Sequence, residues 1–587
     1  MILRALYDYY HRCEGLPAPG LEEKEIGFLI VITPEGRFVQ FEDCRSEKNS
    51  ARTFLVRKQV GRSSSPVANY LYDNCAYVLG FCNPDKAKNE SARQKEADKT
   101  RKCYDVFIRK VQEISSLFPD NAAITAVRRF YEQGRENILE QAMRDPLWED
   151  IVRNLSKKYS TFSFRIQGDT KIVAEKRELL QLETAEDDGS GVQNLCLITG
   201  QRGPSVETTT PTIISGSKPT AKLVSFQVNS GYDSYGKSKC YNAPISREAE
   251  FAYTTALKAL LGKASRNKFL LGTRTFLFWA SGSSQAAQEA ELSLFSLLGF
   301  HDEKKDDPNA HVKKVRDVFQ AIYSGQLRTT LDDRFYILGL APNSARIAVV
   351  YWAETILRDF AGRIMNHFND MELADNRPDK KPYQGIREML SAVTLGGKVS
   401  DATPNLPEAV ARSIFQGLPY PFTLFSSCIR RIRAEQSPYL ARVAILKAYL
   451  NRLNDENKKL YIMLDRENNN IGYLCGRLFA VLEKIQEDAS HINSIRERYM
   501  NAASATPSAV FPTVLNLSVH HSEKLNEGSK IFHERLKQEI IGKLPADGFP
   551  PHLDLQDQGR FFVGYYHQRQ DFFTKKSETN EQSMDNN

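Results

Sequence analysis

The sequence predicts an α+β protein, with a mixed α/β N-terminal region of short β-sheets followed by an all-helical C-terminal bundle. The chain has 587 residues, which is more than one hydrophobic core usually organises, so two or more domains are expected. β-rich runs recur upstream of the proline-containing stretch 400–409, and helical periodicity replaces them downstream. We therefore expect domains at 1–400 and 401–587.

Five signals define the first elements. Residues 26–42 contain two β-rich runs joined by Pro-Glu-Gly, which predicts a hairpin. The charged stretch 83–102 indicates a solvated helix face or a mobile insertion, with phosphate contacts as the alternative. Helical spacing of apolar residues follows at 105–118 and 121–133, and a further β-rich run lies at 160–166.

The middle of the chain contains both strand and helix signals. Residues 222–228 form another β-rich run, and Ser246 is placed as the N-cap of a helix. The segment 335–368 is predicted to open as a strand and then become a long helix. Helical patterns that make a bundle then recur at 408–416, 423–435, 439–454, 472–489 and 522–542.

Composition points to a folded protein of the cytoplasm. The chain is 41% hydrophobic and 26% charged, with a formal net charge of +7. The positive excess lies upstream of Met463, which weakly favours a polyanionic partner. The nine cysteines form no C-x-x-C pair, so neither a disulfide framework nor a zinc ribbon is indicated. No apolar run reaches the roughly eighteen residues of a membrane span, and we expect no membrane association.

The loop 231–238 satisfies the letter of the phosphate-binding pattern G-x-x-x-x-G-K-[ST]. Such a loop must lead directly into a helix whose N-terminus faces the phosphate. Pro244 follows too soon for that, because the residue before a proline is pushed out of helical geometry. The loop instead suits a nucleic-acid backbone, with Lys237 and Lys239 for phosphate and Tyr235 or Asn242 for a base or sugar. A structural turn is the alternative.

Signals for catalysis are weak. Neither a G-x-S-x-G elbow nor an H-E-x-x-H motif is present. Arg363 and His367 share one helix face, which could suggest ribonuclease chemistry, but a satisfied surface pair is favoured because no supporting residues lie nearby. We expect a non-enzymatic protein that needs no metal or cofactor, and the alternative is a nucleotide hydrolase or nuclease that uses the 231–238 loop or this pair.

Several blocks along the chain resemble one family. They are MILRALYDYYHR at the start, YDNCAYVLG at 72–80, the series VSF, SYG, NAP and GTRTFLFWA within 224–280, and GRLFAVLEKIQ and GYYHQRQ near the end. Together they resemble the large subunit of the type I-C CRISPR surveillance complex, called Cascade, of the Csd-type family. The resemblance extends over nearly the whole chain.

This resemblance implies a function. Such subunits read the protospacer-adjacent motif in double-stranded DNA, promote R-loop formation, steady the displaced non-target strand and help recruit the helicase-nuclease. Protein reads a short duplex signal, and base pairing with the guide RNA reads the rest. The implied partners are target DNA and its displaced single strand, the CRISPR guide RNA, the helicase-nuclease, and the backbone, guide-processing and small subunits.

Candidate DNA contacts lie in three places. In the segment that belongs to the motif-reading region, Asn74 follows Tyr72, and an Asn side chain can bond bidentately to adenine or donate to a minor-groove acceptor. A turn or cap role is the alternative. Upstream, Arg57 and Lys58 are candidates for phosphate. In the helical half a basic stripe for the displaced strand is predicted, with a solvated face as the alternative; its residues are Arg430, Arg431 and Arg433, with Arg442, Lys447 and Arg452 downstream. In the module that follows Met463, further basic residues are expected to face the displaced strand, among them Arg477, Lys484, Arg496 and Arg498.

Residues 463–587 resemble the separate small subunit of the same complex. In the type I-C family this part of the gene can also be translated from an internal start, and Met463 is positioned for that role. The alternative is that Met463 is a buried helix residue, as single methionines among apolar neighbours usually are.

Overall fold

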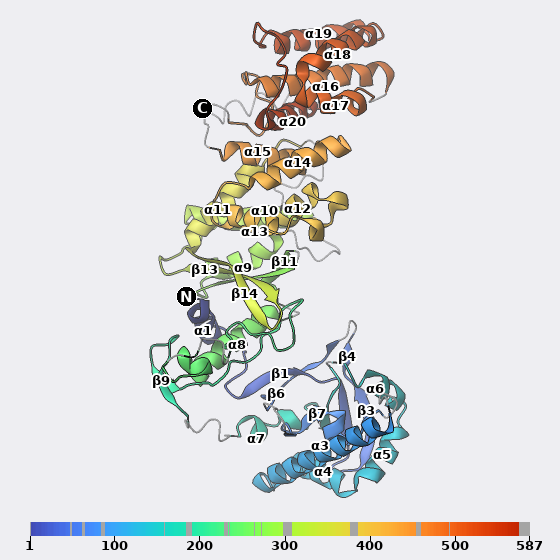
Figure 1. Ribbon diagram of the computed structural model, residues 1–587, viewed down its shortest axis with the longest axis vertical. Coiled ribbons are helices and arrows are strands. Elements are labelled where there is room, and N and C mark those ends of the chain that lie inside the picture. Colours follow the sequence, from blue (N-terminus) through green and yellow to red (C-terminus); the bar gives the residue numbers. More distant parts are fainter. Residues whose placement is uncertain are drawn as a thin grey trace. The chain divides into compact units, whose positions relative to one another are not determined.

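The computed structural model describes residues 2–46, 50–60, 65–83, 89–157, 159–182, 191–227, 233, 235–262, 265–271, 273–297, 308–375, 385–453, 459–491 and 494–573. The packing divides the chain into two compact units (Figure 1). The N-terminal unit comprises Cys13–Val206 and Ala243–Thr255. The C-terminal unit comprises Met1–Arg12, Glu207–Asn242 and Ala256–Asn587. The predicted domains at 1–400 and 401–587 stay a prediction.

A four-stranded sheet of order β3-β2-β8-β7 organises the N-terminal unit. The predicted hairpin is confirmed as β2 (Phe28–Ile32) and β3 (Phe38–Asp43), and the run at 160–166 as β8 (Thr161–Ile166). β8 lies parallel to β2, and β7 (Tyr72–Asn74) pairs antiparallel with the outer side of β8. β7 is therefore an edge strand.

Helices cover this sheet. The charged stretch from residue 89 onward is the solvated first half of α3 (Glu90–Leu117), which Asn89 caps by accepting from the Ala92 N–H (2.8 Å). The predicted helices at 105–118 and 121–133 are confirmed as the second half of α3 and as α4 (Ala122–Glu132). Residues 84–88 of the charged stretch lie outside the described residues. The remaining elements of the unit are β1 (Leu21–Glu25), β4 (Arg45–Ser46), β5 (Ser50–Ala51), β6 (Thr53–Arg57), α2 (Cys75–Val78), α5 (Arg135–Met143), α6 (Trp148–Asn154), η2 (Val173–Glu175), α7 (Arg177–Leu180), β9 (Gln193–Leu195) and β10 (Arg202–Pro204).

The C-terminal unit begins with an antiparallel sheet, β11-β12-β13-β14. Its strands are β11 (Lys268–Leu271), β12 (Arg274–Ala280), β13 (Arg334–Asn343) and β14 (Arg346–Ile356). The prediction of one strand followed by a long helix at 335–368 was wrong in part, because a hairpin comes first and the helix α11 starts only at Leu357. A tight turn at Ser344, whose φ is 55°, reverses the chain and pairs the two apolar runs.

Two further sequence signals had different outcomes. Ser246 is confirmed as an N-cap, since its Oγ accepts from the Ala249 N–H (3.2 Å) at the start of α8 (Arg247–Leu261). The prediction of a strand at 222–228 was wrong, because residues 222–227 make only an isolated bridge between Lys222 and Arg346. A β-branched run forms a strand only where a partner strand is available.

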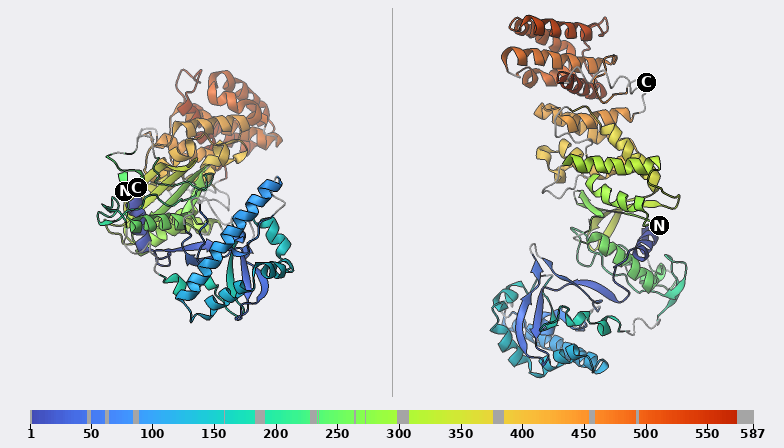
Figure 2. Two further views of the ribbon diagram at one scale, coloured as in Figure 1. Left: turned by 60° about the horizontal axis from the view of Figure 1, so that its bottom comes forward. Right: turned by 180° about the vertical axis from the view of Figure 1, so that it is seen from behind.

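Helices stack from the sheet outward in the C-terminal unit (Figures 1 and 2). One continuous hydrophobic core extends from sheet residues such as Phe276 to Phe561 and Tyr565 of the last helix. The five predicted bundle helices are found, whereas α17, α18 and α20 were missed. The helices of the unit are α1 (Ile2–Arg12), η3 (Lys239–Asn242), α9 (Gln285–Leu297), α10 (Pro308–Ser324), α11 (Leu357–Met371), α12 (Ile386–Val393), η4 (Leu395–Gly397), η5 (Val399–Asp401), α13 (Leu406–Phe415), α14 (Phe422–Glu435), α15 (Leu440–Asn451), α16 (Ile471–Ser490), α17 (Ser494–Ala505), α18 (Pro507–Ser522), α19 (Glu527–Ile541) and α20 (Leu555–Asp571).

Glycines let α16 and α20 approach closely. A Cβ built on Gly476 would lie 1.9 Å from the carbonyl oxygen of Phe561, and one on Gly564 would lie 2.3 Å from that of Tyr473. Both contacts are with backbone, which cannot rotate away. These glycines therefore set the distance between the two helices.

We predict that Gly476→Ala lowers the unfolding temperature of the full chain. Alanine favours a helix by about 1 kcal/mol over glycine, but forcing α16 and α20 apart costs roughly 1–3 kcal/mol or more. Gly528→Ala is the matched control, because that exposed position in α19 has its nearest side-chain atom at 3.6 Å. Calorimetry that finds the Gly476→Ala protein as stable as the unaltered one would contradict this packing.

The same helix pair buries His567. Its side chain is 1% exposed, its Nδ1 lies 2.9 Å from the Tyr473 hydroxyl, and burial lowers its pKa to about 3. An unfolded histidine titrates near pH 6.5. Between these two values the unfolded chain binds a proton that the folded chain does not, so stability falls as the pH drops from about 6.5 towards 3.

We predict that His567→Gln flattens this pH dependence. The lost slope is up to about 1.4 kcal/mol per pH unit below pH 6.5, since glutamine does not titrate. The measurement compares the unfolding temperatures of the two proteins between about pH 8 and pH 5, which cancels other titrating groups common to both. A difference that stays constant over this range would mean that His567 is not held neutral.

Candidate nucleic-acid interface

Asn74 ends the edge strand β7 and caps helix α2. Its Oδ1 accepts from the Ala76 N–H (3.1 Å), and its own N–H donates to Oδ1 of Asp73 (2.9 Å). The side chain is exposed, and among the described residues no hydrogen-bond partner occupies its Nδ2 amine. Because the oxygen is engaged, bidentate adenine recognition is disfavoured, while donation from Nδ2 to a groove acceptor stays available.

The chain before Asn74 is held in an uncommon conformation. Leu71 is fully buried and has a φ of 59°, which a leucine rarely adopts. Asp73, 2% exposed, fixes the turn by accepting from the Asn69 N–H through Oδ2 (3.1 Å). Ser163 of β8 adds a bond from its hydroxyl to the Leu71 carbonyl (2.9 Å). Strain maintained by several bonds is typical of functional sites.

The aromatic and basic candidates beside Asn74 are largely internal. Tyr72 is fully buried and donates its hydroxyl to the Arg57 carbonyl (2.6 Å). Arg57 is 6% exposed, and its guanidinium lies 5.7 Å from the ring centre of Tyr70. Lys58 is half-buried, with its ammonium 5.8 Å from the Phe251 ring. Of these three candidates, Lys58 keeps the most surface for a phosphate.

The loop 231–238, which satisfies the phosphate-binding pattern, leads into the short 3₁₀ helix η3 and not into a phosphate-binding α-helix. Residues 231, 232 and 234 of it lie outside the described residues. Tyr235 is fully exposed and Lys237 is exposed, so both can meet a ligand. Asn242 is half-buried, and its Nδ2 donates to the Lys239 carbonyl (3.2 Å), while Lys239 itself pairs with Glu207. The first α-helix after Lys237 begins only at Arg247.

The predicted basic stripe of the bundle divides into exposed and paired residues. Arg430 is exposed and donates to the Ser427 hydroxyl (2.9 Å), and Arg433 is half-buried. Arg431 pairs with Glu435, and this pairing, with a second from Arg442, holds the pKa of that carboxyl below its usual value. Arg430 is thus the one predicted stripe residue that this part of the described chain leaves clearly exposed.

The downstream stripe residues are internal, since Arg442 and Lys447 are buried and Arg452 pairs with Asp370. The two candidates on α16 are paired as well. Arg477 is fully buried and donates to Glu539 (2.9 Å) and to Gln568 (3.1 Å). These bonds join α16 to α19 and α20, so the residue acts inside the bundle. Lys484 is half-buried and bonds to Asp488 (2.7 Å).

The Arg363 and His367 pair is not a surface pair, as had been favoured. His367 is fully buried, and its Nδ1 lies 2.8 Å from the Tyr420 hydroxyl. Burial raises the pKa of Tyr420 well above its usual value, which keeps that hydroxyl protonated. Arg363 donates to the Phe415 carbonyl (3.3 Å). A buried histidine with a structural partner cannot reach a substrate as placed.

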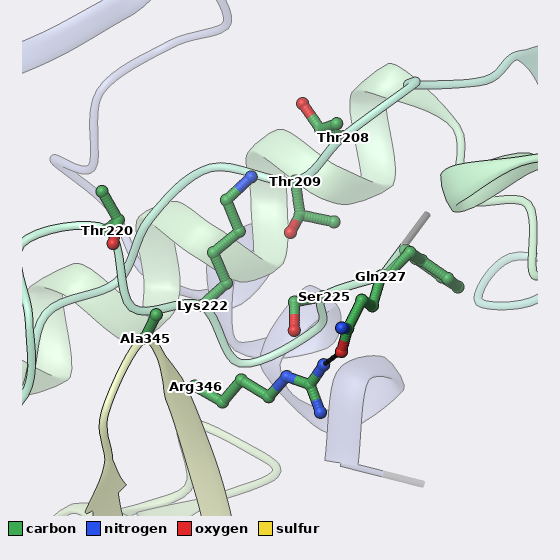
Figure 3. Close-up of a pocket in the computed structure, with 9 residues that line it drawn as sticks. Thr208, Thr209, Thr220, Lys222, Ser225, Gln227, Ala345 and Arg346 are labelled. Carbon is green, nitrogen blue, oxygen red and sulfur yellow. Dashed lines mark hydrogen bonds between the residues drawn. The ribbon is translucent and has the colours of Figure 1, made fainter. Parts of the chain in front are cut away.

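Sequence reasoning missed a polar pocket in the C-terminal unit (Figure 3). The cavity measures about 310 Å³ and lies between the segment 208–227 and the tip of the β13–β14 hairpin. Lys222 and Arg346 contribute cations, and Ser225 contributes a hydroxyl. The signal was faint, because Lys222 and Ser225 stand in a run that was assigned to a strand and Arg346 is distant in sequence.

The comparison with protein families decides the assignment. A model of the CRISPR-associated protein family Cas_Csd1 matches residues 6–573. The chain belongs to the Cas_Csd1 family. No curated protein matches it. As a Csd1-type protein it is a Cascade-type CRISPR-associated protein, which works with other Cas proteins and nucleic acids.

Among the described residues, no helix is both long and apolar enough to cross a membrane. Within the same residues, no group of three or more His, Cys, Asp or Glu side chains is arranged to hold a metal ion.

We predict that the purified protein does not bind ATP at micromolar concentration and that Lys237→Ala leaves this unchanged. The reason is that no α-helix follows Lys237 to direct its N-terminus at a phosphate. Isothermal titration with ATP and magnesium tests this, alongside assays for turnover of ATP and for cutting of nucleic acid. Micromolar binding that disappears in the variant would restore the hydrolase alternative.

Proposed function

We propose that this Csd1-family protein is the large subunit of a type I-C Cascade complex and that it has no catalytic activity of its own. In this role it recognises the protospacer-adjacent motif in double-stranded DNA and promotes R-loop formation. It then steadies the displaced non-target strand and helps recruit the helicase-nuclease. The family match over residues 6–573 supports the complex, and the exposed amide of Asn74 is the observation that supports motif reading.

The position of Asn74 suits the reading of a base edge. A groove reader needs a polar side chain that projects from a rigid element. Asn74 lies at the end of a strand whose preceding turn is fixed by Asp73 and Ser163. Its cap bond to Ala76 orients the amide, so the Nδ2 donor is presented without loss of rotamer entropy on binding. A minor-groove acceptor is the base feature that such a donor recognises.

Partly or fully exposed cations would position the nucleic acid. Lys58 lies in the same unit as Asn74, and a phosphate contact there would fix the register of the duplex. In the C-terminal unit, Arg430 and Arg433 are the stripe residues proposed for the displaced strand, together with the exposed Tyr235 and Lys237 of the loop. Guide RNA, the backbone and guide-processing subunits, and the small subunit complete the proposed assembly.

We predict that Asn74→Ser weakens binding of the assembled complex to correctly flanked DNA by roughly 1–3 kcal/mol, the scale of one base contact. Serine retains a capping acceptor for the Ala76 N–H but loses the amide donor. Asn89→Ser is the matched control, since Asn89 also caps a helix in the same unit. Binding is measured against flanked and unflanked duplexes. Equal losses on both DNAs would assign Asn74 to folding.

The segment that starts at Met463 is proposed to serve also as the small subunit. Met463 is 43% exposed and lies in the connection between α15 and α16, so it is not a buried helix residue. A product beginning there would contain α16–α20 as a unit. In the full chain α20 packs against α15, which the shorter product lacks. The apolar face of α20 that α15 covers would then be exposed and would need another protein surface.

We predict that expression of the natural gene with its partner genes yields a second, shorter chain beginning at or near Met463. Intact-mass spectrometry of the purified complex would detect it. Met463→Leu should remove the short chain while leaving the full-length protein, because the side chain is not part of the core. A complex that contains only the full-length chain would contradict the proposal.

A further inference from the structure

We propose that the pocket between the segment 208–227 and the β13–β14 hairpin binds one nucleotide of a single-stranded nucleic acid. Its phosphate would be held by Lys222 and Arg346, and its unpaired base would stack on Phe226. All three residues line the cavity. This site lies in the C-terminal unit and does not involve Asn74, so it stands independently of motif reading.

The pocket is held by backbone hydrogen bonds. The Ile347 N–H donates to the Lys222 carbonyl (3.1 Å), and the Lys218 N–H donates to the Ser344 carbonyl (3.1 Å). A third bond, from the Thr212 N–H to the Ala221 carbonyl (2.8 Å), closes the segment on itself. The hairpin tip and the segment are thus fixed to each other, and the pocket walls are preorganised for a ligand.

The positive charge of the pocket lining favours the binding of an anion. An isolated bridge pairs the backbones of Lys222 and Arg346, so both cationic side chains start from the same part of the pocket wall. The lining contains no carboxylate. Among the described residues no hydrogen bond or ion pair engages the Lys222 ammonium, and Arg346 donates to Gln227 (2.7 Å). A phosphate group in the cavity would accept charge-assisted hydrogen bonds from these two side chains.

Hydroxyl groups complete the anion site. Figure 3 shows the Lys222 ammonium extending toward Thr209 and the Arg346 guanidinium toward Gln227, with Ser225 between the two side chains. Thr208 and Thr220 also line the cavity. Hydroxyl and amide groups beside Arg and Lys are the side chains that contact phosphate and sugar in nucleic-acid interfaces.

Size and the aromatic ring select a single strand. A volume of about 310 Å³ lies at the small end of ligand pockets and admits one nucleotide unit, not a duplex. Phe226 is half-buried and lines the cavity, and the proposal places an unpaired base against its ring. A basic groove that tracks the backbone, together with an aromatic side chain, is the usual means of holding a single strand.

The test measures binding of fluorescent oligonucleotides to the full-length protein by anisotropy. The probes are a single-stranded DNA, the RNA of the same sequence and the corresponding DNA duplex. The variants are Lys222→Gln and Phe226→Leu. The matched control is Lys218→Gln, because Lys218 is exposed on the same segment but does not line the pocket.

Lys222→Gln should weaken binding of one single strand roughly tenfold or more, the scale of a lost hydrogen bond to a charged group. It should also reduce the salt slope of the affinity by about 0.7, the value for one phosphate of a single strand. Phe226→Leu should weaken binding about tenfold with the salt slope unchanged, since stacking releases no counterions. The control should match the unaltered protein, and the strand that responds identifies the ligand as RNA or DNA.

Unchanged affinity of both variants for both single strands would overturn the proposal, as would a loss confined to the duplex. If a variant unfolds, the unaltered protein still tests whether a single strand binds in this pocket. Photo-crosslinking of a bromouracil-containing strand, followed by peptide mass spectrometry, should label the peptide that contains Phe226. Crosslinks found only in other peptides would overturn the assignment.

Discussion

The parallel pairing of β2 with β8 is the constraint on which the candidate interface of the N-terminal unit depends. Parallel neighbours cannot be joined by a tight turn, so a long connection must cross between them. That connection contains β7 and helices α3 to α6, whose apolar sides cover the sheet. The stacked rings of Phe28 and Phe162, 5.2 Å apart, lie at the register that fixes β8. β7 pairs with the outer side of β8, which brings Asn74 to the sheet edge.

Ion pairing decides which basic residues can meet a polyanion. A cation that already has a carboxylate partner in a dry environment contributes to packing, since breaking such a pair leaves an uncompensated charge. Arg477 with Glu539 is of this kind. Lys222 lines a cavity with hydroxyl groups and no carboxylate, and its ammonium extends toward Thr209 (Figure 3). Local charge density along the sequence therefore says little about nucleic-acid contacts until the partners of each residue are known.

Much of the secondary structure could be predicted from the sequence, because it depends on local pattern. The turn residues predicted the hairpin of β2 and β3, and the capping chemistry of serine predicted the helix N-cap at Ser246. Prediction failed where a partner element decides the outcome. The run at 335–368 gave a hairpin because the turn at Ser344 lets two apolar runs pair, and the run at 222–228 lacked a neighbouring strand. Helix α18 was missed although Pro507 lies in its first turn, which is a local signal typical of a helix start.

The candidate sites follow the same division. By itself the sequence determined the family and the α+β class. It also showed that Pro244 prevents a helix directly after the loop 231–238, and it made Asn74 a candidate DNA contact. These conclusions depend on residue identity and near neighbours. Tertiary structure alone decided that Asn74 presents its amide nitrogen while its oxygen caps α2, because the cap bond exists only in the folded turn. It alone buried Arg477 and His367, and it alone brought Lys222 to Arg346. The physical reason is that burial and pairing are set by contacts between residues far apart in the chain, which local periodicity does not encode.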